Sequence, residues 1–414
     1  MKNILLLMAL FFATGVAAKS QKQSLEIKNT LPIMRKDAPV NVSLTHIPFT
    51  VRKAVVTIGG KEIPSQLDDL TGDGTPDALC FLVDIDKQQT LKADITYSDQ
   101  GKQADYPARV YVDMMLTNKK IKEENKQDLY IDQLKVKRGV NPYWMLHHHG
   151  AAFESELAAY RIYFDHRQTV DIYGKYNKQL ELKQTQFYPD NAQKAAGFGD
   201  DVLWVGNTLG VGALRGFDGG KPVMLEDLDH RGQRIVSEGP LRTIVEVLDD
   251  NWIPAPGQKA VTMRTYYTLY AGHRDCEVSC VFSKQNDNKY CTGIINVKNS
   301  TEYSDHKGLR GCWGTDWPVS AKDSVGHKRE TVGLGICIPR KNIIKELPAD
   351  KDNYSFCVKP TQRSLNYYIV FGSDNESFGY HSAEQWFAYL QEWKKDIDNP
   401  LEVKVASTGA KQKK

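Results

Sequence analysis

Three consecutive histidines, His147, His148 and His149, stand just before the carboxylates Glu154 and Glu156 in the stretch HHHGAAFESE. Histidine changes charge near neutral pH and can act as a general acid, a general base or a metal ligand. On an extended strand His147 and His149 would point to one side and His148 to the other. The stretch is a candidate for acid–base catalysis, for a metal site completed by a distant ligand, or for one structural and two solvated histidines.

The segment after the histidines, AYRIYFDHRQTVDIYGK, predicts a β-hairpin with its turn near residues 165–167. Tyr160 lies on one face of its first strand and Arg161 on the other. If the strand extends back to residue 154, Glu154 and Glu156 lie on the Tyr160 face, about 7 Å apart. An inverting glycoside hydrolase needs a carboxylate pair at roughly 6.5–9.5 Å. Alternate positions on any strand give this spacing, so spacing alone does not establish catalysis.

Two further clusters combine histidine with arginine. The stretch AGHRDCE places His273 and Arg274 before a strand, and LDHRGQR places His230 and Arg231 in a turn region. The planar guanidinium group binds carboxylates with two parallel hydrogen bonds, so several arginines near histidines would suit an acidic sugar. Each arginine alone could equally be an ion-pair partner at the surface.

Aromatic residues are available to bind sugar rings. The stretch WGTDW contains Trp313 and Trp317, and the chain has 7 Trp and 20 Tyr in all. Their flat apolar faces could hold pyranose rings, although many must belong to the core. We take Trp313 and Trp317 as candidate substrate-binding residues.

An aspartate-rich loop is the one indication of a metal. In DDLTGDGTPDAL, Asp69, Asp73 and Asp77 surround Gly72 and Gly74. Oxygen ligands at alternate positions with glycine at a bend resemble calcium loops, but the spacing is not that of an EF-hand and the terminal Glu is missing. An Asp-Gly turn between two strands explains the loop as well, and we favour the turn. No cofactor is required, and Ca²⁺ at residues 69–77 is the alternative.

Short strand signals dominate the chain and predict a mainly β fold. Runs of four to eight residues between turn signals indicate a small N-terminal β-sandwich, and longer runs beyond it indicate a large antiparallel sandwich. The clearest helix is SAEQWFAYLQEWKKDI, with Ser382 as its cap. The expected division is a signal peptide at 1–18, a β-sandwich domain at 19–105, a carbohydrate-active β-supersandwich domain at 106–400 and a Lys-rich flexible tail at 401–414.

Composition narrows the classes of function. The stretch MKNILLLMALFFATGVAAKS reads as a signal peptide, so we expect a periplasmic or secreted protein without a membrane span. The 54 basic and 51 acidic residues are interleaved, which argues against nucleic-acid binding. Seven cysteines without a Cys-x-x-Cys motif argue against a thiol-disulfide oxidoreductase. The alternation in CEVSCVF predicts that Cys276 and Cys280 are buried on one face of a strand.

Three long strings together resemble one known family. HHHGAAFESELAAYRIYFDHRQTVDIYGK, AAGFGDDVLWVG and RTYYTLYAGHRDCEV are similar to domain-of-unknown-function family 4861 of Bacteroidetes. The resemblance implies an exported protein associated with polysaccharide utilisation, whose large domain is similar to the galactose-mutarotase-like supersandwich. In that fold a concave sheet holds sugars, and histidine with a carboxylate transfers protons. No catalytic motif of those enzymes can be placed on this sequence residue by residue.

These observations lead to a functional hypothesis: a carbohydrate-active enzyme that processes uronate-containing, pectin-like oligosaccharides by lyase or hydrolase chemistry. Elimination needs a base, a cation beside the substrate carboxylate and an acid at the leaving oxygen. The candidate bases are His148 and His149, the candidate cations Arg161 and Arg231, and the candidate acids Glu156, Tyr160 and His273. The alternatives are a non-catalytic glycan-binding protein and a sugar mutarotase or epimerase.

Overall fold

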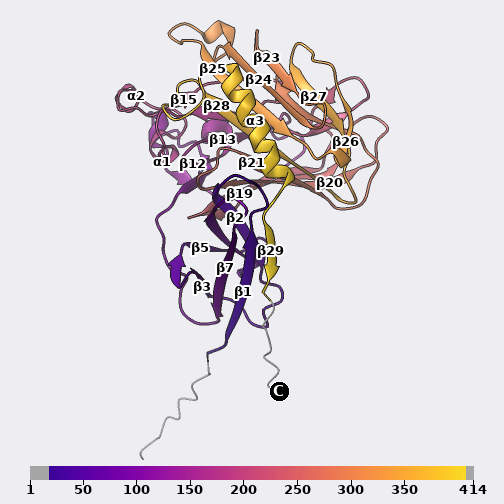
Figure 1. Ribbon diagram of the computed structural model, residues 1–414. Coiled ribbons are helices and arrows are strands. Elements are labelled where there is room, and N and C mark those ends of the chain that lie inside the picture. Colours follow the sequence, from indigo (N-terminus) through magenta and orange to yellow (C-terminus); the bar gives the residue numbers. More distant parts are fainter. Residues whose placement is uncertain (1–17, 407–414) are drawn as a thin grey trace, which may run out of the picture.

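The computed structural model describes residues 18–406. The predicted signal peptide, apart from Ala18, and residues 407–414 of the predicted tail lie outside the described residues. Within them the chain is mainly β, as predicted, and forms a small unit and a large unit (Figure 1). No helix among residues 18–406 is long and apolar enough to cross a membrane.

The small unit is a sandwich of two antiparallel sheets. Apolar side chains at alternate positions of both sheets, among them Ile27, Val40, Val56 and Phe81, form its core. This alternation is the reason that each strand has one buried face. The five-stranded sheet has the order β29 (Glu402–Val405), β1 (Ser20–Lys28), β7 (Thr90–Ser98), β3 (Lys53–Ile58), β4 (Lys61–Ile63), and the three-stranded sheet β2 (Arg35–Ser43), β6 (Ala78–Ile85), β5 (Ser65–Asp68).

The large unit packs a nine-stranded antiparallel sheet against two five-stranded sheets. The nine strands have the order β11 (Gln133–Lys137), β18 (His230–Glu238), β19 (Arg242–Trp252), β20 (Val261–Tyr270), β21 (Cys276–Phe282), β28 (Ser364–Ser373), β25 (Glu330–Cys337), β24 (Leu309–Asp316), β23 (Thr301–Ser304). One smaller sheet is β15 (Asp200–Asp201), β14 (Val170–Gly174), β13 (Ala159–Tyr163), β12 (Gly150–Ser155), β8 (Val110–Asp113). The other is β17 (Pro222–Val223), β16 (Arg215–Phe217), β22 (Tyr290–Ile295), β27 (Asn353–Val358), β26 (Ile343–Glu346).

The remaining elements are short connections. Strands β9 (Met115–Leu116) and β10 (Leu129–Tyr130) pair with each other. The helical pieces are α1 (Leu182–Thr185), α2 (Asn191–Ala195), η1 (Glu124–Lys126), η2 (His147–His149), η3 (Ala321–Asp323) and η4 (Arg340–Asn342).

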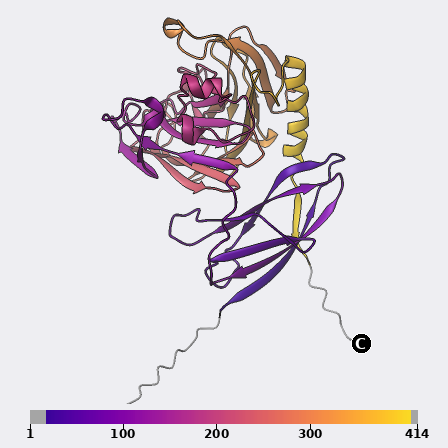
Figure 2. The ribbon, with the colours of Figure 1, turned by 90° about the vertical axis from the view of Figure 1, so that its left-hand side faces the viewer.

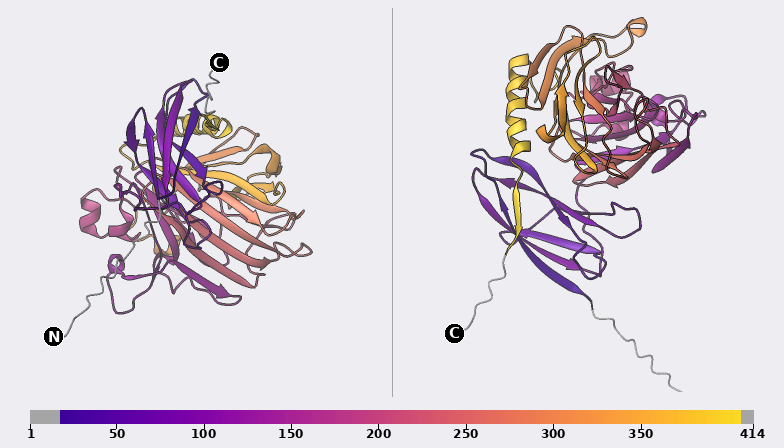
Figure 3. Two further views of the ribbon diagram at one scale, coloured as in Figure 1. Left: turned by 90° about the horizontal axis from the view of Figure 1, so that it is seen from below. Right: turned by 90° about the vertical axis from the view of Figure 1, so that its right-hand side faces the viewer.

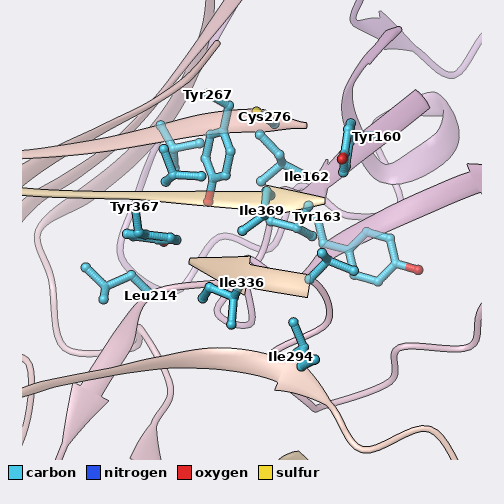
Figure 4. Close-up of a cluster of buried hydrophobic side chains, with 14 of the residues drawn as sticks. Tyr160, Ile162, Tyr163, Leu214, Tyr267, Cys276, Ile294, Ile336, Tyr367 and Ile369 are labelled. Atoms are coloured by element: carbon cyan, nitrogen blue, oxygen red, sulfur yellow. The ribbon is translucent and has the colours of Figure 1, made fainter. Parts of the chain in front are cut away.

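One continuous core fills the space between the sheets of the large unit. Figure 4 shows Ile162 from β13, Ile369 from β28 and Ile336 from β25 meeting in it. Burial alternates along β21, so that Cys276 and Cys280 are buried as predicted, and all seven cysteines are buried and free. Free buried cysteines behave as small apolar side chains.

Helix α3 (Ala383–Asp398) packs along the face of β24 and β25 that points away from this core (Figure 3, right). Ser382 caps the helix by accepting a hydrogen bond from the Gln385 amide, as the sequence predicts. Glycines allow the close approach, because a Cβ atom on Gly311 would lie 2.3 Å from the Leu390 side chain. The helix is therefore a fixed part of the large unit.

After α3 the chain returns to the small unit, where β29 pairs with β1 (Figures 1 and 2). The predicted flexible tail at 401–414 is wrong for residues 402–405, because the ladder between Leu25 and Val405 holds them. The sequence analysis missed this short strand because it grouped these residues with the Lys-rich segment that follows them. The small unit is thus built from both ends of the described chain, and the expected division at residues 105 and 106 stays a prediction.

Candidate functional site

The three histidines form the tight turn η2, and β12 begins only after them at Gly150. The extended arrangement, with His147 and His149 on one side, is therefore not found. His148 and His149 have φ values of 42° and 71°. Left-handed backbone at non-glycine residues costs on the order of 1–3 kcal/mol each and is concentrated at functional sites. Gly150 is needed because a Cβ there would lie 1.9 Å from the Ile162 carbonyl oxygen.

His148 is paired with a buried carboxylate. Its Nε2 lies 3.0 Å from Oδ1 of Asp113 at the end of β8, and Oδ2 of Asp113 accepts a hydrogen bond from the Tyr111 hydroxyl at 2.9 Å. Because a carboxylate accepts hydrogen bonds, Nε2 of His148 carries the proton. The other nitrogen, Nδ1, is buried without a partner among the described residues. His148 is fixed in orientation, and its second ring nitrogen is left without a partner among the described residues.

His149 is held as a neutral imidazole. Its Nδ1–H donates to the Tyr143 carbonyl at 3.0 Å, and its ring stacks on the Tyr143 ring at 3.8 Å between centroids. Burial, together with the positive charge of Arg161, lowers the pKa of His149 to about 4. At neutral pH the imidazole is uncharged, and the lone pair lies on Nε2. This geometry presents a general base whose orientation is fixed by its other nitrogen.

His147 completes the group of histidines. Its Nε2 is buried and has no partner within residues 18–406, and its ring packs edge to face with those of His148 and Tyr188. Burial and the neighbouring His148 lower the pKa of His147 to about 3. The turn therefore holds two unpartnered buried nitrogens, on His147 and His148. Such groups cost free energy and are expected to find a partner in a ligand or water.

Arg161 on β13 lies beside this turn and holds two carboxylates. Its guanidinium group donates to Asp171 at 2.7 and 3.0 Å and to Asp201 at 2.8 Å, and it lies near the hydroxyls of Tyr163 and Tyr188, each at 3.3 Å. Its positive charge is thus already neutralised. The predicted role of Arg161 as the cation beside a substrate carboxylate has no free charge to support it.

Asp201 is a candidate acid. Burial and the neighbouring Asp171 raise the pKa of Asp201 well above its usual range, outweighing Arg161. Its side chain nevertheless keeps 23% exposure. The partly exposed Asp201 carboxyl and the His149 imidazole are thus two titratable groups whose pKa values are pushed in opposite directions relative to their usual ranges by their surroundings.

Trp144 and Trp204 are exposed. Trp144 is 77% exposed, and its ring centroid lies 5.3 Å from that of His149. Trp204, 47% exposed, follows Asp201 closely, and its amide donates to the carbonyl of Trp317. The Trp144 ring is therefore available to a ligand beside His149.

Other predicted site residues lie in a second cluster, at the seam between the two units. The Arg109 guanidinium group joins Glu156 to Asp37 of the small unit. His273 uses both nitrogens, with Nδ1 at 3.1 Å from Asp275 and Nε2 at 3.0 Å from the Asp37 carbonyl. Burial alone would lower the pKa of His273, but the hydrogen bond to Asp275 reverses this effect and raises it.

Tyr160 and Arg274 are buried between the site and the seam. The Tyr160 hydroxyl donates to the Arg274 carbonyl at 2.6 Å, and Arg274 pairs with Glu376 at 2.9 Å. The predicted Glu154–Glu156 pair on the Tyr160 face is wrong, because the chain turns after β12 and Glu154 lies opposite Ala159 on the Arg161 face. Glu154 instead binds Lys175 in a fully buried pair.

The remaining candidates lie elsewhere in the large unit. His230 and Arg231 begin β18, where His230 lies 3.5 Å from Asp250 and Arg231 donates to the Leu225 carbonyl. Trp313 packs near Trp386 beneath α3. The structure therefore does not bring these three to the histidine turn.

The aspartate-rich loop is occupied by its own hydrogen bonds. Both oxygens of Asp69 accept backbone amides, among them those of Gly72 and Gly74, while Asp77 accepts those of Leu70 and Thr71 and Asp73 that of Thr75. These hydrogen bonds agree with the interpretation of residues 69–77 as a turn, which the sequence analysis favoured over a calcium loop. Among residues 18–406 no group of three or more His, Cys, Asp or Glu is arranged to hold a metal ion.

Sequence reasoning missed Asp113, Asp171 and Asp201. The first two were detectable, because VYVDMML and TVDIYG each place one aspartate inside an otherwise apolar strand, and a carboxylate that cannot reach water needs a buried partner. Asp201 gave no such signal, since its meeting with Arg161 depends on the pairing of β14 with β15.

Comparison with known proteins gives a family and a loose structural likeness. A family model described as a domain of unknown function (DUF4861) matches residues 27–403. No curated protein matches the sequence. Two solved structures are similar at 10% identity: an alpha-mannosidase from Enterococcus faecalis V583, with a TM-score of 0.44 over 93% of this chain, and a protein in the glycosyl hydrolase family 38 from Enterococcus faecalis, with a TM-score of 0.45 over 93% of this chain. The chain spans 46% and 47% of their respective lengths.

Proposed function

The chain belongs to the DUF4861 family, whose description assigns no activity, and we propose from the geometry that the histidine turn is the active site of an enzyme acting on oligosaccharides. The observation that carries the proposal is His149, a neutral imidazole with Nε2 free and Nδ1 fixed by the Tyr143 carbonyl. Exposed Trp144 beside it offers a face for a sugar ring.

The proposed reaction is β-elimination on a uronate-containing chain. His149 Nε2 removes the proton on the carbon next to the uronate carboxylate. The electron pair forms the carbon–carbon double bond as the carbon–oxygen bond to the leaving sugar breaks. The Asp201 carboxyl, whose pKa is raised by burial and by Asp171, donates a hydrogen bond to the uronate carboxylate, the task first given to Arg161. The Tyr188 hydroxyl, whose pKa is raised by burial, gives its proton to the leaving oxygen.

The test is to incubate the full chain with uronate oligosaccharides and to follow the ultraviolet absorbance of the unsaturated product, with chromatography and NMR of all products. We expect absorbance to rise, and His149→Ala to abolish the rise while the variant still folds, as its cooperative melting curve shows. The matched control is His306→Ala, because His306 is 82% exposed and lies in the loop between β23 and β24.

Other outcomes contradict the proposed reaction in distinct ways. Cleaved product without unsaturation would mean hydrolysis at the same site. A changed anomeric or stereochemical ratio without cleavage would mean a mutarotase or epimerase. Binding without any product would mean a glycan-binding protein.

A further inference from the structure

A cavity of about 650 Å³ lies at the seam between the two units, lined by β2 and its preceding loop, by the outer face of β20, β21 and β28, and by α3. Figure 2 shows these three parts converging where α3 meets the small unit. Ligand pockets commonly have volumes of about 300–1,000 Å³ and favour boundaries between units. None of the residues assigned above to the proposed reaction lines it.

Aromatic rings form much of the wall. Tyr368 comes from β28, and Tyr389 and Trp393 come from α3. Phe378 and Tyr380 close the cavity from the loop that precedes the helix. These rings supply apolar faces from three separate segments of the chain.

Unused polar groups lie between the rings. Glu277 stands opposite Tyr368 in the strand ladder, and its carboxylate forms no hydrogen bond with the described residues. The indole N–H of Trp393, a side chain only 5% exposed, forms no well-aligned hydrogen bond with the described residues, although it faces Asp275 and helps to lower the pKa of that carboxyl. Oδ1 of Asp396 lacks a hydrogen bond there and lies 3.7 Å from Nε of Arg35. The Glu277 carboxylate is therefore the acceptor left to sugar hydroxyls on this wall.

The two arginines of the cavity are already engaged, and of the lysines that line it, Lys36 and Lys178, the second lies over the Phe378 ring. Arg274 is held by Glu376 at 2.9 Å, and Arg35 donates to the carbonyls of Asp396 and Asn399 at the end of α3. No free guanidinium group remains to bind a carboxylate, and Glu277 would repel one. We propose that the seam cavity is a second carbohydrate site, which binds an uncharged sugar unit through the rings of α3 and the carboxylate of Glu277.

This inference goes beyond the proposed function and stands apart from it. It is tested on the full chain by calorimetric titration with neutral disaccharides of galactose, glucose, mannose, arabinose and rhamnose. We expect at least one to bind with a stoichiometry of one. Glu277→Gln should weaken binding roughly tenfold, since it replaces one of the two carboxyl oxygens by an amide donor, and Trp393→Phe should weaken it severalfold while keeping an aromatic ring.

Two controls keep the outcome interpretable. Glu26→Gln removes an exposed carboxylate on β1 and should leave binding unchanged, and melting temperatures identify any variant that fails to fold. His149→Ala should also leave neutral-sugar binding unchanged, so failure of the active-site proposal does not affect this one. Failure of every disaccharide to bind, or affinity unaltered in both Glu277→Gln and Trp393→Phe, would overturn the inference. So would tighter binding of a cationic amino sugar than of any neutral one.

Discussion

The histidine turn and the seam cluster contain the same kinds of residue but use them differently. Each combines a histidine, arginine and two carboxylates: His149 with Arg161, Asp171 and Asp201, and His273 with Arg109, Asp37 and Glu156. At the seam both nitrogens of His273 are bonded. At the turn, buried nitrogens of His147 and His148 have no partner among the described residues, and the backbone is left-handed.

This difference separates a structural cluster from a candidate active site. Fully satisfied buried ion pairs fix how two surfaces meet, whereas unpaired polar atoms and backbone strain persist only where the surrounding structure maintains them, commonly for function. Residue type alone placed His149 and His273 in one predicted catalytic set. The hydrogen bonds divide that set into two.

The largest effect is expected from Asp201→Asn, and the distinction between the two clusters fails if this variant keeps its activity. Because burial and Asp171 raise the pKa of the Asp201 carboxyl well above its usual range, a neutral amide of the same shape should cost little stability. Turnover should fall by roughly 10²- to 10⁴-fold, the usual contribution of a positioned acid. Steady-state kinetics with a thermal melt measure both, and normal kcat would remove Asp201 from the mechanism.

Asp68→Ala, at the seam, should do the opposite of Asp201→Asn: it should lower the stability of the fold and leave turnover unchanged. Asp68 of the small unit accepts two hydrogen bonds from the buried Arg242, at 2.8 and 2.6 Å. Removing one partner of such a pair should lower the free energy of unfolding by about 3–5 kcal/mol. Urea denaturation measures the loss. Turnover per folded molecule should be retained, and its disappearance would show that the seam takes part in catalysis.

The two histidines should affect stability with opposite dependence on pH. The pKa of His149 lies at about 4 in the folded chain, below its value of roughly 6.5 in the unfolded chain. The unfolded chain therefore binds the extra proton between those values, and stability falls as the pH drops from 6.5 towards 4. The pKa of His273 is raised, so its contribution is present below about 6.5 and is lost as the pH rises through the raised value.

Melting temperatures of variants between pH 5 and pH 8 measure this contrast. His149→Ala should be less destabilising at pH 5 than at pH 8, and His273→Ala should be more destabilising at pH 5. Equal pH dependence in both variants would contradict the assignment of a neutral His149 and a charged, paired His273.

The smallest effect is expected from Trp144→Ala. This exposed ring would lose contact with the sugar, which should raise KM by about twofold to tenfold while kcat changes little. Trp144→Phe should restore much of the affinity. An unchanged KM would mean that the substrate lies elsewhere on the turn.

Local sequence patterns predicted the individual helices and strands better than the contacts between them. The alternation in CEVSCVF and the spacing of Trp386, Leu390 and Trp393 gave a correct strand and helix, because side-chain periodicity is a local property. The hairpin turn near residues 165–167 was also correct. The pairing of β29 with β1 was missed, since it joins residues almost the whole chain apart.

The candidate site shows the same limit: its residues were predicted better than the contacts that hold them. The sequence singled out His149 and Arg161, but the turn that fixes the histidines depends on contacts with Tyr143, and Asp201 arrives through a separate strand. Hydrogen-bond partners of this kind are set by the tertiary fold. No spacing in the sequence distinguishes an unpaired histidine from a paired one.

The central claim is that the unsatisfied histidine turn, and not the fully bonded His273 cluster at the seam, carries the acid–base chemistry. The most direct test is turnover of uronate oligosaccharides by His149→Ala and His273→Ala, each normalised to the folded fraction of the protein. We predict that His149→Ala loses at least about a hundredfold in kcat, while His273→Ala keeps the activity of the unmodified chain. Full activity in His149→Ala together with loss in His273→Ala would contradict the account.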